Sequence, residues 1–486
     1  MGIKTGSGMH HRQGVKIQGS GLLPQYAMNF LTGSLDPSLT YTSGGNRMLY
    51  NSAGLLQWAP ANMLLNSATL GTQSVTAVSG YSYTLSFQGT GSVTGSGGWT
   101  GTLNGAGASN RVSVAFTAST TSVTFTVTGS VTSAQLEPTS YNSPLAYNAT
   151  TASAYYGPRF DYNPSTLAIN GLLLEQSSTN LQVRSNTFND ASWVGFGFTL
   201  TPNTTTSPDG TVNASSVSLG AGSYYFNNSF LPAAGPVTMS IWAKAQSGTQ
   251  KFRLQAYNGT NYNSPDFTAT SVWQRFTFTP TLTAVSTNFA IVNDSTNDAT
   301  SLYIYQAQAE QLAFATSPIP TTTTILSRSA ESLTNSSIPW FNATQGTMFV
   351  ESMVPATGGL LSGTIWPLAS IYTSATNNIT LATDGYHSGY TALQIYQSGS
   401  QTELLDTTYI PSSGMAFKIG GSYSSTASAV VTNGGTVATS GAVGLPTGLT
   451  TLGFTLNNIG QQWLRNFSYY NTQLTNTQLQ NISGAL

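Results

Sequence analysis

The alternating stretch Tyr81-Ser82-Tyr83-Thr84-Leu85-Ser86-Phe87 places a large apolar residue at every second position and a hydroxyl residue between each pair. Because successive side chains of a β-strand point to opposite faces, this pattern predicts a strand with one buried and one solvated face. The same alternation returns at residues 112–116 and 123–127, and glycine-rich clusters at 95–98 and 105–107 separate the runs. Residues 61–148 are therefore predicted to form a small antiparallel β-sandwich.

Residues 180–325 repeat this design at greater length. Val237, Met239, Ile241 and Ala243 alternate along one predicted strand, and the turn signal Ser247-Gly248-Thr249 follows it. A second β-sandwich is predicted here. We expect its tryptophans to belong to the core rather than to a ligand platform: Trp193, Trp242 and Trp273.

The two regions share their opening and closing phrases. Asn62-Met63-Leu64-Leu65-Asn66-Ser67 parallels Asn180-Leu181-Gln182-Val183-Arg184-Ser185, and Ala134-Gln135-Leu136-Glu137 parallels Ala307-Gln308-Ala309-Glu310. Matching phrases at both ends of two predicted units indicate an internal duplication. The closing phrase resembles the "AQLE…ATSYIPT" ending of jelly-roll carbohydrate-binding modules in phage proteins, which implies the jelly-roll form for both sandwiches.

The composition predicts a nearly uncharged surface. Charged residues make up 6% of the chain and aromatic residues 11%, with a formal net charge of −1 and no cysteine. There is therefore no electrostatic case for nucleic acid as a partner, and disulfides and thiolate metal sites are excluded. No apolar run is long enough to predict membrane insertion. Short hydroxyl and amide side chains lose little entropy when subunits pack together, so a homo-oligomer is favoured.

Residues 1–60 are interpreted as an N-terminal arm that anchors the chain to a larger assembly. The first 30 residues are rich in glycine and precede every acidic residue of the chain, and their basic and imidazole side chains are the candidate anchor: Lys4, His10, His11, Arg12 and Lys16. A flexible tail is the alternative interpretation. No signal-peptide core follows Met1, which predicts synthesis without export.

A phrase between the two sandwiches carries the most specific resemblance. It reads Gly157-Pro158-Arg159-Phe160-Asp161-Tyr162-Asn163-Pro164, then Gly171-Leu172-Leu173-Leu174-Glu175-Gln176, then Thr179-Asn180-Leu181. It resembles the "PRFDYDP…GLLIEE…TNLL" phrase of a family of tailed-bacteriophage virion proteins, and residues 35–57 resemble a phrase that precedes it there. The resemblance implies that residues 149–179 connect a virion-proximal region to β-sandwich modules of carbohydrate-binding type.

The remaining residues, 326–486, resemble a laminin G-like, concanavalin A-like sandwich. The resemblance rests on a predicted strand at 346–351, a central hairpin near 433–435 and a closing strand at 463–470. Thr475 and Gln478 have the spacing of a capping box, which predicts one short helix at about 475–483. The predicted fold is thus all-β, with tandem sandwiches after an extended arm and a single terminal helix.

No motif for catalysis is present, and we expect a protein that is not an enzyme. The close acid pairs, Asp294 with Asp298 and Glu403 with Asp406, could in principle cleave a glycoside. Both pairs lie in sequence rich in Asn, Ser and Thr, where aspartates more often form Asx turns. For Asp161 and Glu175 the alternatives are a Ca²⁺ site and, with greater weight, an ion pair or turn cap involving Arg159 or Arg184.

The most site-like segment is Asp384-Gly385-Tyr386-His387-Ser388-Gly389-Tyr390. Aromatic faces stack on sugar rings, and carboxylates accept hydrogen bonds from sugar hydroxyls. Asp384, Tyr386, His387 and Tyr390 are accordingly the candidate glycan-binding residues. A glycine-flanked turn whose tyrosines cover one end of a sandwich is the alternative, and the greater weight lies with it. No cofactor is expected; laminin G-like domains often bind Ca²⁺, so a metal stays an open question.

These observations predict a bacteriophage fibre or spike protein on the particle surface, made in the bacterial cytoplasm. Its partners would be other virion proteins (tail, portal or major capsid protein), copies of itself, by analogy as a trimer, and a host-surface polysaccharide. One alternative is a capsid head fibre or decoration protein that binds the major capsid protein. A further alternative is a spike that depolymerises capsular polysaccharide.

Overall fold

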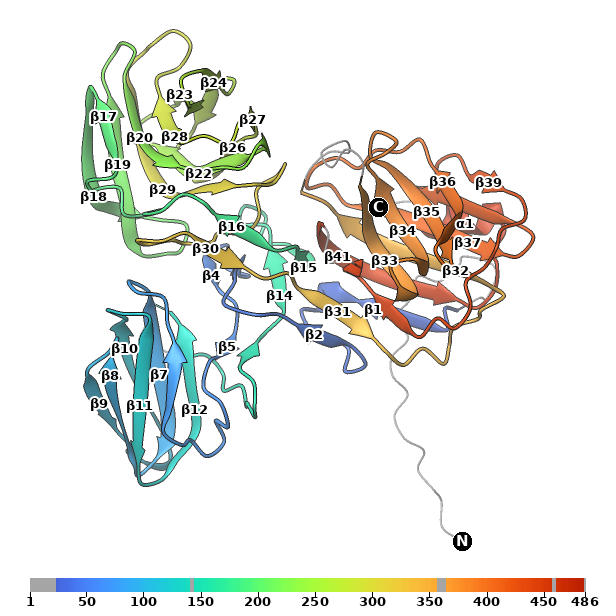
Figure 1. Ribbon diagram of the computed structural model, residues 1–486, viewed down its shortest axis with the longest axis horizontal. Coiled ribbons are helices and arrows are strands. Elements are labelled where there is room, and N and C mark those ends of the chain that lie inside the picture. Colours follow the sequence, from blue (N-terminus) through green and yellow to red (C-terminus); the bar gives the residue numbers. More distant parts are fainter. Residues whose placement is uncertain (1–22, 140–143, 356–363, 457–459, 485–486) are drawn as a thin grey trace.

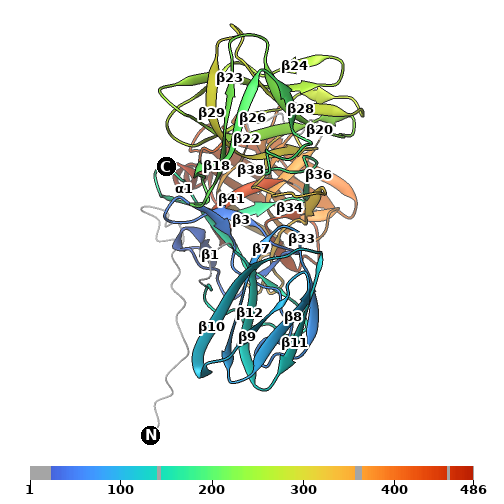
Figure 2. The ribbon, with the colours of Figure 1, turned by 90° about the vertical axis from the view of Figure 1, so that its left-hand side faces the viewer.

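The computed structural model describes residues 23–139, 144–355, 364–456 and 460–484. Three β-sandwiches surround a set of connecting strands (Figure 1). The first and second sandwiches lie at opposite ends of the view in Figure 2, with the C-terminal sandwich behind them. Only one α-helix occurs among these residues, α1 (Asn476–Ser483). The predicted all-β fold is confirmed, and no described helix is long and apolar enough to cross a membrane.

The first sandwich is built from two antiparallel sheets whose apolar faces meet. Tyr83, Leu85 and Phe87 point into the core and are almost completely buried. Thr84 and Ser86 between them are buried as well, and Ser86 accepts from the Arg111 guanidinium at 2.7 Å, so the predicted solvated face of this strand is covered. The sheets have the orders β10-β7-β12 and β6-β11-β8-β9. Their strands are β6 (Gln73–Thr76), β7 (Ser82–Gly89), β8 (Ser92–Gly97), β9 (Gly101–Asn104), β10 (Gly107–Thr117), β11 (Ser122–Thr128) and β12 (Val131–Pro138).

The second sandwich has the same plan with longer sheets. One has the order β18-β19-β29-β22-β26 and the other β17-β20-β28-β23-β24, with β25 paired to β23. Phe226, Phe289 and Leu254 of the latter sheet point into the core. The strands are β17 (Val194–Phe196), β18 (Phe198–Thr206), β19 (Val212–Leu219), β20 (Tyr225–Phe230), β22 (Thr238–Ala245), β23 (Gln250–Tyr257), β24 (Asn261–Asn263), β25 (Phe267–Ala269), β26 (Gln274–Phe278), β28 (Thr287–Val292) and β29 (Thr300–Glu310).

The predicted duplication is visible in the hydrogen bonds of two buried asparagines. The side-chain amide of Asn62 donates to the carbonyls of Ala134 and Asn148, and its oxygen accepts from the main chain of Leu64 and Leu136. Asn180 makes the same set of bonds, with the carbonyls of Ala307 and Ile319 and the main chain of Gln182 and Ala309. Each asparagine therefore joins the opening phrase of its sandwich to the closing phrase.

The C-terminal sandwich contains strands from distant parts of the chain. Its sheets have the orders β14-β15-β41-β32-β37-β38-β39, with β1 also paired to β41, and β2-β31-β40-β33-β34-β35-β36. The strands are β1 (Tyr26–Asn29), β2 (Thr40–Thr42), β14 (Arg159–Tyr162), β15 (Ile169–Glu175), β31 (Ser332–Asn335), β32 (Gln345–Met353), β33 (Ile365–Ser374), β34 (Asn377–Asp384), β35 (Tyr390–Gln397), β36 (Ser400–Asp406), β37 (Phe417–Ser424), β38 (Ser428–Thr432), β39 (Ala438–Ser440), β40 (Thr451–Gly453) and β41 (Gln461–Tyr470).

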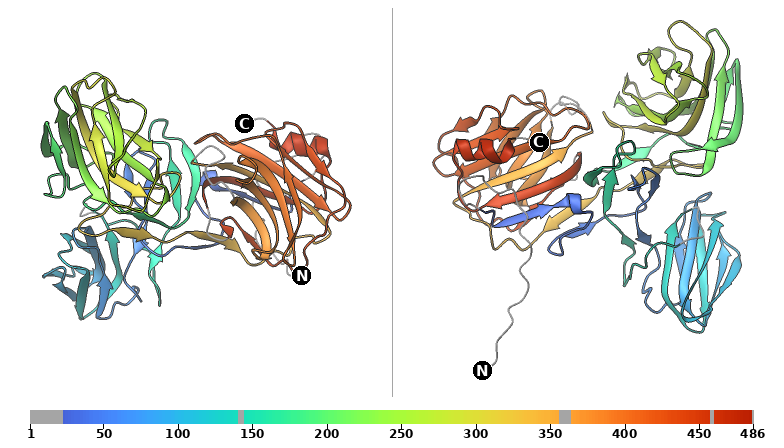
Figure 3. Two further views of the ribbon diagram at one scale, coloured as in Figure 1. Left: turned by 45° about the horizontal axis from the view of Figure 1, so that its top comes forward. Right: turned by 180° about the vertical axis from the view of Figure 1, so that it is seen from behind.

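Segments that we assigned to the arm and the connector are thus structural parts of this sandwich. The blue strand β1 lies alongside the red strand β41 (Figure 3). The family phrase forms the hairpin β14–β15, which adds to β41, and Leu172 and Leu174 enter the common core. Gly171 lies in this hairpin at φ +132°, where a Cβ atom would come within 2.5 Å of the Leu464 carbonyl oxygen. The glycine of the phrase is therefore required by a close approach of backbone.

Short strands complete the junction between the three sandwiches. They are β3 (Met48–Tyr50), β4 (Leu56–Trp58), β5 (Ala61–Asn62), β13 (Tyr155–Tyr156), β16 (Ser178–Asn180) and β30 (Leu326–Arg328), together with β21 (Gly235–Pro236) and β27 (Thr281–Leu282) on the second sandwich and the short 3₁₀ helix η1 (Phe30–Thr32). The hairpin β3–β4 packs on the second sandwich, where the indole of Trp242 donates to the Tyr50 hydroxyl at 2.8 Å.

A buried ionic cluster, which we call the hub, lies where these segments meet. Arg159 pairs with Glu175 at 2.7 Å and with Glu331, and Arg328 also pairs with Glu175 at 2.7 Å. The side chains of all four are at most 3% exposed. The main-chain N–H of Ser317 donates to Glu175 at 2.7 Å. The ion-pair interpretation of Glu175 is confirmed for Arg159, whereas Arg184 pairs with Asp190 instead.

The hub predicts a specific acid sensitivity. Burial alone would raise the pKa of Glu175, but the guanidinium groups of Arg159 and Arg328 and the Ser317 donors outweigh it and lower that pKa to about 2. A lowered pKa stabilises the fold above the ordinary value of about 4.5, and this contribution is lost as the pH falls from there toward 2. Glu175→Gln should lower the free energy of unfolding by about 3 kcal/mol at pH 7. Unfolding curves from pH 7 to 2.5 should show this difference shrinking below pH 4.5; a constant difference would contradict the assignment.

The predicted terminal helix is also present. The Thr475 hydroxyl accepts from the main chain of Gln478, and the Gln478 side chain accepts from the main chain of Thr475, so the capping box is complete. Leu479 and Ile482 bury one face of α1 against Phe349 and Val431.

The cap gives a prediction with an internal control. Thr475→Ala should destabilise the helix by about 1 kcal/mol because it leaves a main-chain donor without its partner. Thr477→Ala, on the exposed face of the same helix, should stabilise it slightly because alanine has the higher helix propensity. Amide hydrogen exchange in α1 measures both effects. Equal protection in the two variants would contradict a capping role for Thr475.

Candidate functional site

A groove with polar walls lies on the outer face of the sheet β17-β20-β28-β23-β24 in the second sandwich. Its volume is about 650 Å³, within the range of small-molecule sites. Residues that point out of this sheet form its floor, since the alternate residues Phe226, Phe289 and Leu254 are committed to the core. The groove is thus a direct product of the two-residue period of these strands.

Cross-strand register arranges the floor in rows. Asn227, Ala290, Gln255 and Asn263 lie opposite one another on four neighbouring strands. A second row, two residues along, consists of Ser229, Asn288, Tyr257 and Asn261. Neighbouring strands therefore place the polar side chains of a row about 5 Å apart, with Ala290 as the one apolar position of the first row.

Several of these amides have no partner within the chain. Gln255 donates to Asn263 at 2.8 Å. Among the residues that the structure describes, the side chains of Asn227, Asn288 and Asn261 make no hydrogen bond to protein. An amide offers two donors and an accepting oxygen, so these groups can bind a ligand that has both hydroxyl donors and acceptors. Tyr225 and Tyr257, at the edges of the groove, are 40% and 44% exposed.

The first sandwich provides an internal comparison. Its corresponding outer sheet carries Ser74, Thr124, Thr94 and Thr102 where the second sandwich carries amides and tyrosines. These hydroxyls bond to one another, with Ser74 to Thr124 at 2.7 Å and Thr94 to Thr102 at 3.0 Å. The duplicated scaffold therefore has one face whose hydroxyls are mutually paired and one face with unpaired amides.

The groove residues were not among those chosen from the sequence. The sequence pattern that corresponds to the groove is an alternation of polar residues. It consists of Arg253, Gln255 and Tyr257 on one strand and Asn261 and Asn263 on the next. In a chain so rich in Asn and Ser, that alternation is indistinguishable from an ordinary solvated face. The tryptophan prediction is confirmed for Trp193 and Trp242, which are 5% and 2% exposed, while Trp273 is half-buried beneath the ammonium group of Lys244.

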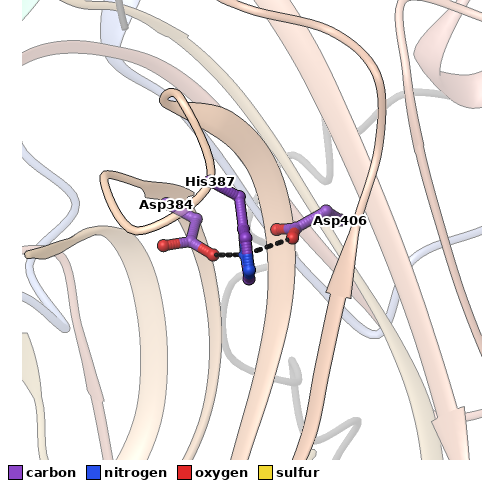
Figure 4. A group of neighbouring side chains, drawn as sticks. All are labelled: Asp384, His387 and Asp406. Atoms are coloured by element: carbon purple, nitrogen blue, oxygen red, sulfur yellow. Dashed lines mark hydrogen bonds and ion pairs between the residues drawn. The ribbon is translucent and has the colours of Figure 1, made fainter. Parts of the chain in front are cut away.

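The segment chosen from the sequence forms the turn between β34 and β35 (Figure 4). Asp384 is buried at the end of β34, and His387 turns its ring toward it, with Nδ1 2.7 Å from Oδ2 of Asp384. Tyr386 is 66% exposed and Tyr390, the first residue of β35, is half-buried. The structure also brings in Asp406 from the end of β36, whose Oδ2 lies 2.8 Å from the same nitrogen.

The electrostatics of this cluster reflect two neighbouring carboxylates. Burial and the charge of Asp384 raise the pKa of Asp406 to about 6. The hydrogen bond that the imidazole donates to Asp384 and the charges of both aspartates raise the pKa of His387. The ligand-type atoms of the three residues lie within 4.8 Å of one another, so this group could hold a metal ion.

The remaining candidates have structural roles or lie outside the described residues. Oδ1 of Asp294 accepts from the main chain of Thr296 and Asp298, which is the predicted Asx turn. Glu403 accepts from Ser428 at 2.7 Å, whereas Asp406 faces His387. The carboxylate of Asp161 accepts hydrogen bonds from the main-chain N–H of Tyr50 and from the indole N–H of Trp463. The candidate anchor residues Lys4, His10, His11, Arg12 and Lys16 lie outside the described residues.

No known family model and no curated protein matches the chain. Solved structures match parts of it at low identity. A tandem pair of carbohydrate-binding modules from Paenibacillus barcinonensis Xyn10C matches at 11% identity and TM-score 0.24, over 61% of this chain and 98% of that one. A tailspike domain of bacteriophage CBA120 matches at 10% and 0.20, over 27% and 21%, and Trypanosoma rangeli sialidase at 10% and 0.23, over 31% and 25%. The chain thus spans about a quarter or less of the latter two. At these TM-scores the matches define no shared fold for the whole chain.

Proposed function

We propose that this chain is a structural protein of a bacteriophage particle that binds a host-surface glycan in the groove of its second sandwich. The observation that carries the glycan assignment is the set of unpaired amides on the groove floor, Asn227, Asn288 and Asn261. Neutral amides suit a neutral polyhydroxyl ligand, because they exchange hydrogen bonds with hydroxyl groups without the cost of burying a charge. The tyrosines at the groove edges offer apolar faces to sugar rings.

The virion assignment is supported by the family phrase and by what the structure does with it. The phrase supplies Arg159, Glu175 and the hairpin β14–β15, which together hold the sandwiches around one junction. Such a junction suits an appendage that must hold its binding face in a fixed direction from the particle. The proposal includes an oligomer, as the uncharged surface favours, and a role without catalysis.

Two experiments test this proposal separately. Purified full-length chain applied to a glycan array and to capsular polysaccharides should bind at least one neutral glycan class, and chromatography should show no new short oligosaccharides. Shorter products would overturn the non-enzymatic role, and an absence of binding to any glycan would overturn the groove assignment.

Immunogold electron microscopy of purified virions tests the location. Antibody against the full chain should label the tail or baseplate if the protein is an adsorption fibre. Label around the capsid would favour the head-fibre alternative, and unlabelled particles would overturn the virion assignment.

A further inference from the structure

The cluster of Asp384, His387 and Asp406 has a hydrogen-bonding imbalance. Nδ1 of His387 faces one oxygen of Asp384 at 2.7 Å and one oxygen of Asp406 at 2.8 Å. That nitrogen carries at most one hydrogen, so it cannot make two full hydrogen bonds at once. Two carboxylates that approach the same point also repel each other when both are ionised. A cation at this point would satisfy all three lone pairs.

The three ligand atoms are close enough to meet at one metal ion. Around a tetrahedral zinc ion with ligands at about 2.1 Å, neighbouring ligand atoms lie about 3.4 Å apart. Nδ1 of His387 lies 2.7 Å and 2.8 Å from the two carboxylate oxygens, so metal binding would move these atoms apart by about 0.6 Å. A shift of this size needs only small rotations of three side chains.

The surroundings orient each ligand. Oδ1 of Asp384 accepts from the main-chain N–H of Tyr386 at 2.8 Å, which directs Oδ2 toward the cluster. The main-chain N–H of Gly389 closes the turn on the Asp384 carbonyl at 2.7 Å. Oδ1 of Asp406 is buried and has no hydrogen-bond partner among the described residues, so it could join the coordination. His387 is 55% exposed, which leaves the other coordination positions open to water.

Calcium, the ion that the laminin G-like resemblance implies, fits this donor set poorly. Calcium takes six to eight oxygen ligands, and a nitrogen ligand is foreign to its sites. Imidazole nitrogen combined with carboxylate oxygen suits zinc and its neighbours in the first transition row.

We propose that Asp384, His387 and Asp406 bind one divalent transition-metal ion of the zinc class. The ion would join the turn after β34 to the end of β36 and thereby fix the loop that carries Tyr386. This site is separate from the groove, and the proposal stands without the glycan assignment.

The test is a calorimetric titration of the chelator-treated full-length chain with Zn²⁺ alone. The absorption spectrum of the chain with Co²⁺ in place of Zn²⁺ then reports whether nitrogen is a ligand. We expect one ion per chain at this site and a loss of at least about 100-fold in its affinity in His387→Gln. Asp406→Asn should also weaken binding. Both variants should keep the circular dichroism of the parent, because His387 is exposed and the asparagine is isosteric.

A matched control is available because the chain has only three histidines. The double variant His10→Gln/His11→Gln removes the other two and should leave the affinity of the proposed site unchanged. Loss of Zn²⁺ binding in that double variant but not in His387→Gln would overturn the site as an adventitious contact of the N-terminal segment. Absence of binding in the parent chain would overturn it outright, and tighter binding of Ca²⁺ than of Zn²⁺ would overturn the metal class.

Discussion

Replacing Arg159 with methionine should lower the free energy of unfolding by about 3–5 kcal/mol. Methionine fills most of the arginine volume but leaves Glu175 and Glu331 buried with fewer positive partners. Arg159 is fully buried and also donates to the Met48 carbonyl at 3.0 Å and to the Ser317 hydroxyl at 2.7 Å. Because these residues belong to separate segments, the loss should affect the junction of all three sandwiches. Denaturant unfolding followed by tryptophan fluorescence measures the change.

Arg184→Met is the matched control for this prediction. Its guanidinium also pairs with a carboxylate, that of Asp190 at 3.0 Å, but both side chains are partly exposed. Exposed pairs contribute little, so this variant should unfold almost as the parent does. Similar destabilisation in the two variants would contradict the special position of the hub. Limited proteolysis should cleave the Arg159 variant between the sandwiches before it cleaves within them.

Replacing Ala290 with tryptophan should reduce glycan affinity by at least about 100-fold, equivalent to about 3 kcal/mol. Ala290 lies at the middle of the groove floor, between Asn227 and Gln255 in the same row. A large side chain there would point into the cavity and exclude a ligand from the unpaired amides. The core behind this strand should be unaffected, because Phe289 and Ile291 face it. Binding to the glycan identified on the array, measured by calorimetry, checks the prediction.

The duplicated sandwich again offers a control. Thr124 lies on the middle strand β11 of the corresponding outer sheet, between Ser74 and Ser96. Thr124→Trp introduces the same side chain on the hydroxyl-paired face and should leave glycan affinity unchanged. Equal loss of affinity in both variants would place the binding site outside the groove of the second sandwich. An unfolding temperature close to that of the parent confirms that each variant is folded.

The local elements of this fold were predictable because their causes are local. The alternation of Tyr83, Leu85 and Phe87 defines which side of β7 faces the core of the first sandwich, whatever strand lies beside it. The helix α1 begins directly after Thr475, at the position that the capping-box spacing of Thr475 and Gln478 predicts. The parallel phrases that begin at Asn62 and Asn180 predicted the duplication. Each asparagine makes the same set of hydrogen bonds within its own sandwich.

The sites were less predictable because they depend on partners that are distant in sequence. Asp384 and His387 could be chosen from one turn, but Asp406 joins them only because β35 pairs with both β34 and β36. The groove needs the outward residues of four strands to meet in register, and each strand alone resembles an ordinary polar face.

The all-β class, the duplicated pair of sandwiches and the terminal helix follow from the order of the amino acids, since side-chain period and capping act over a few residues. The membership of β1, β2 and the β14–β15 hairpin in the C-terminal sandwich became visible in the folded chain alone. The same is true of which of the two similar sheets carries unpaired amides. This difference arises because a strand's own pattern specifies which of its faces turns toward the core, whereas the strand that pairs with it is selected by long-range packing and register.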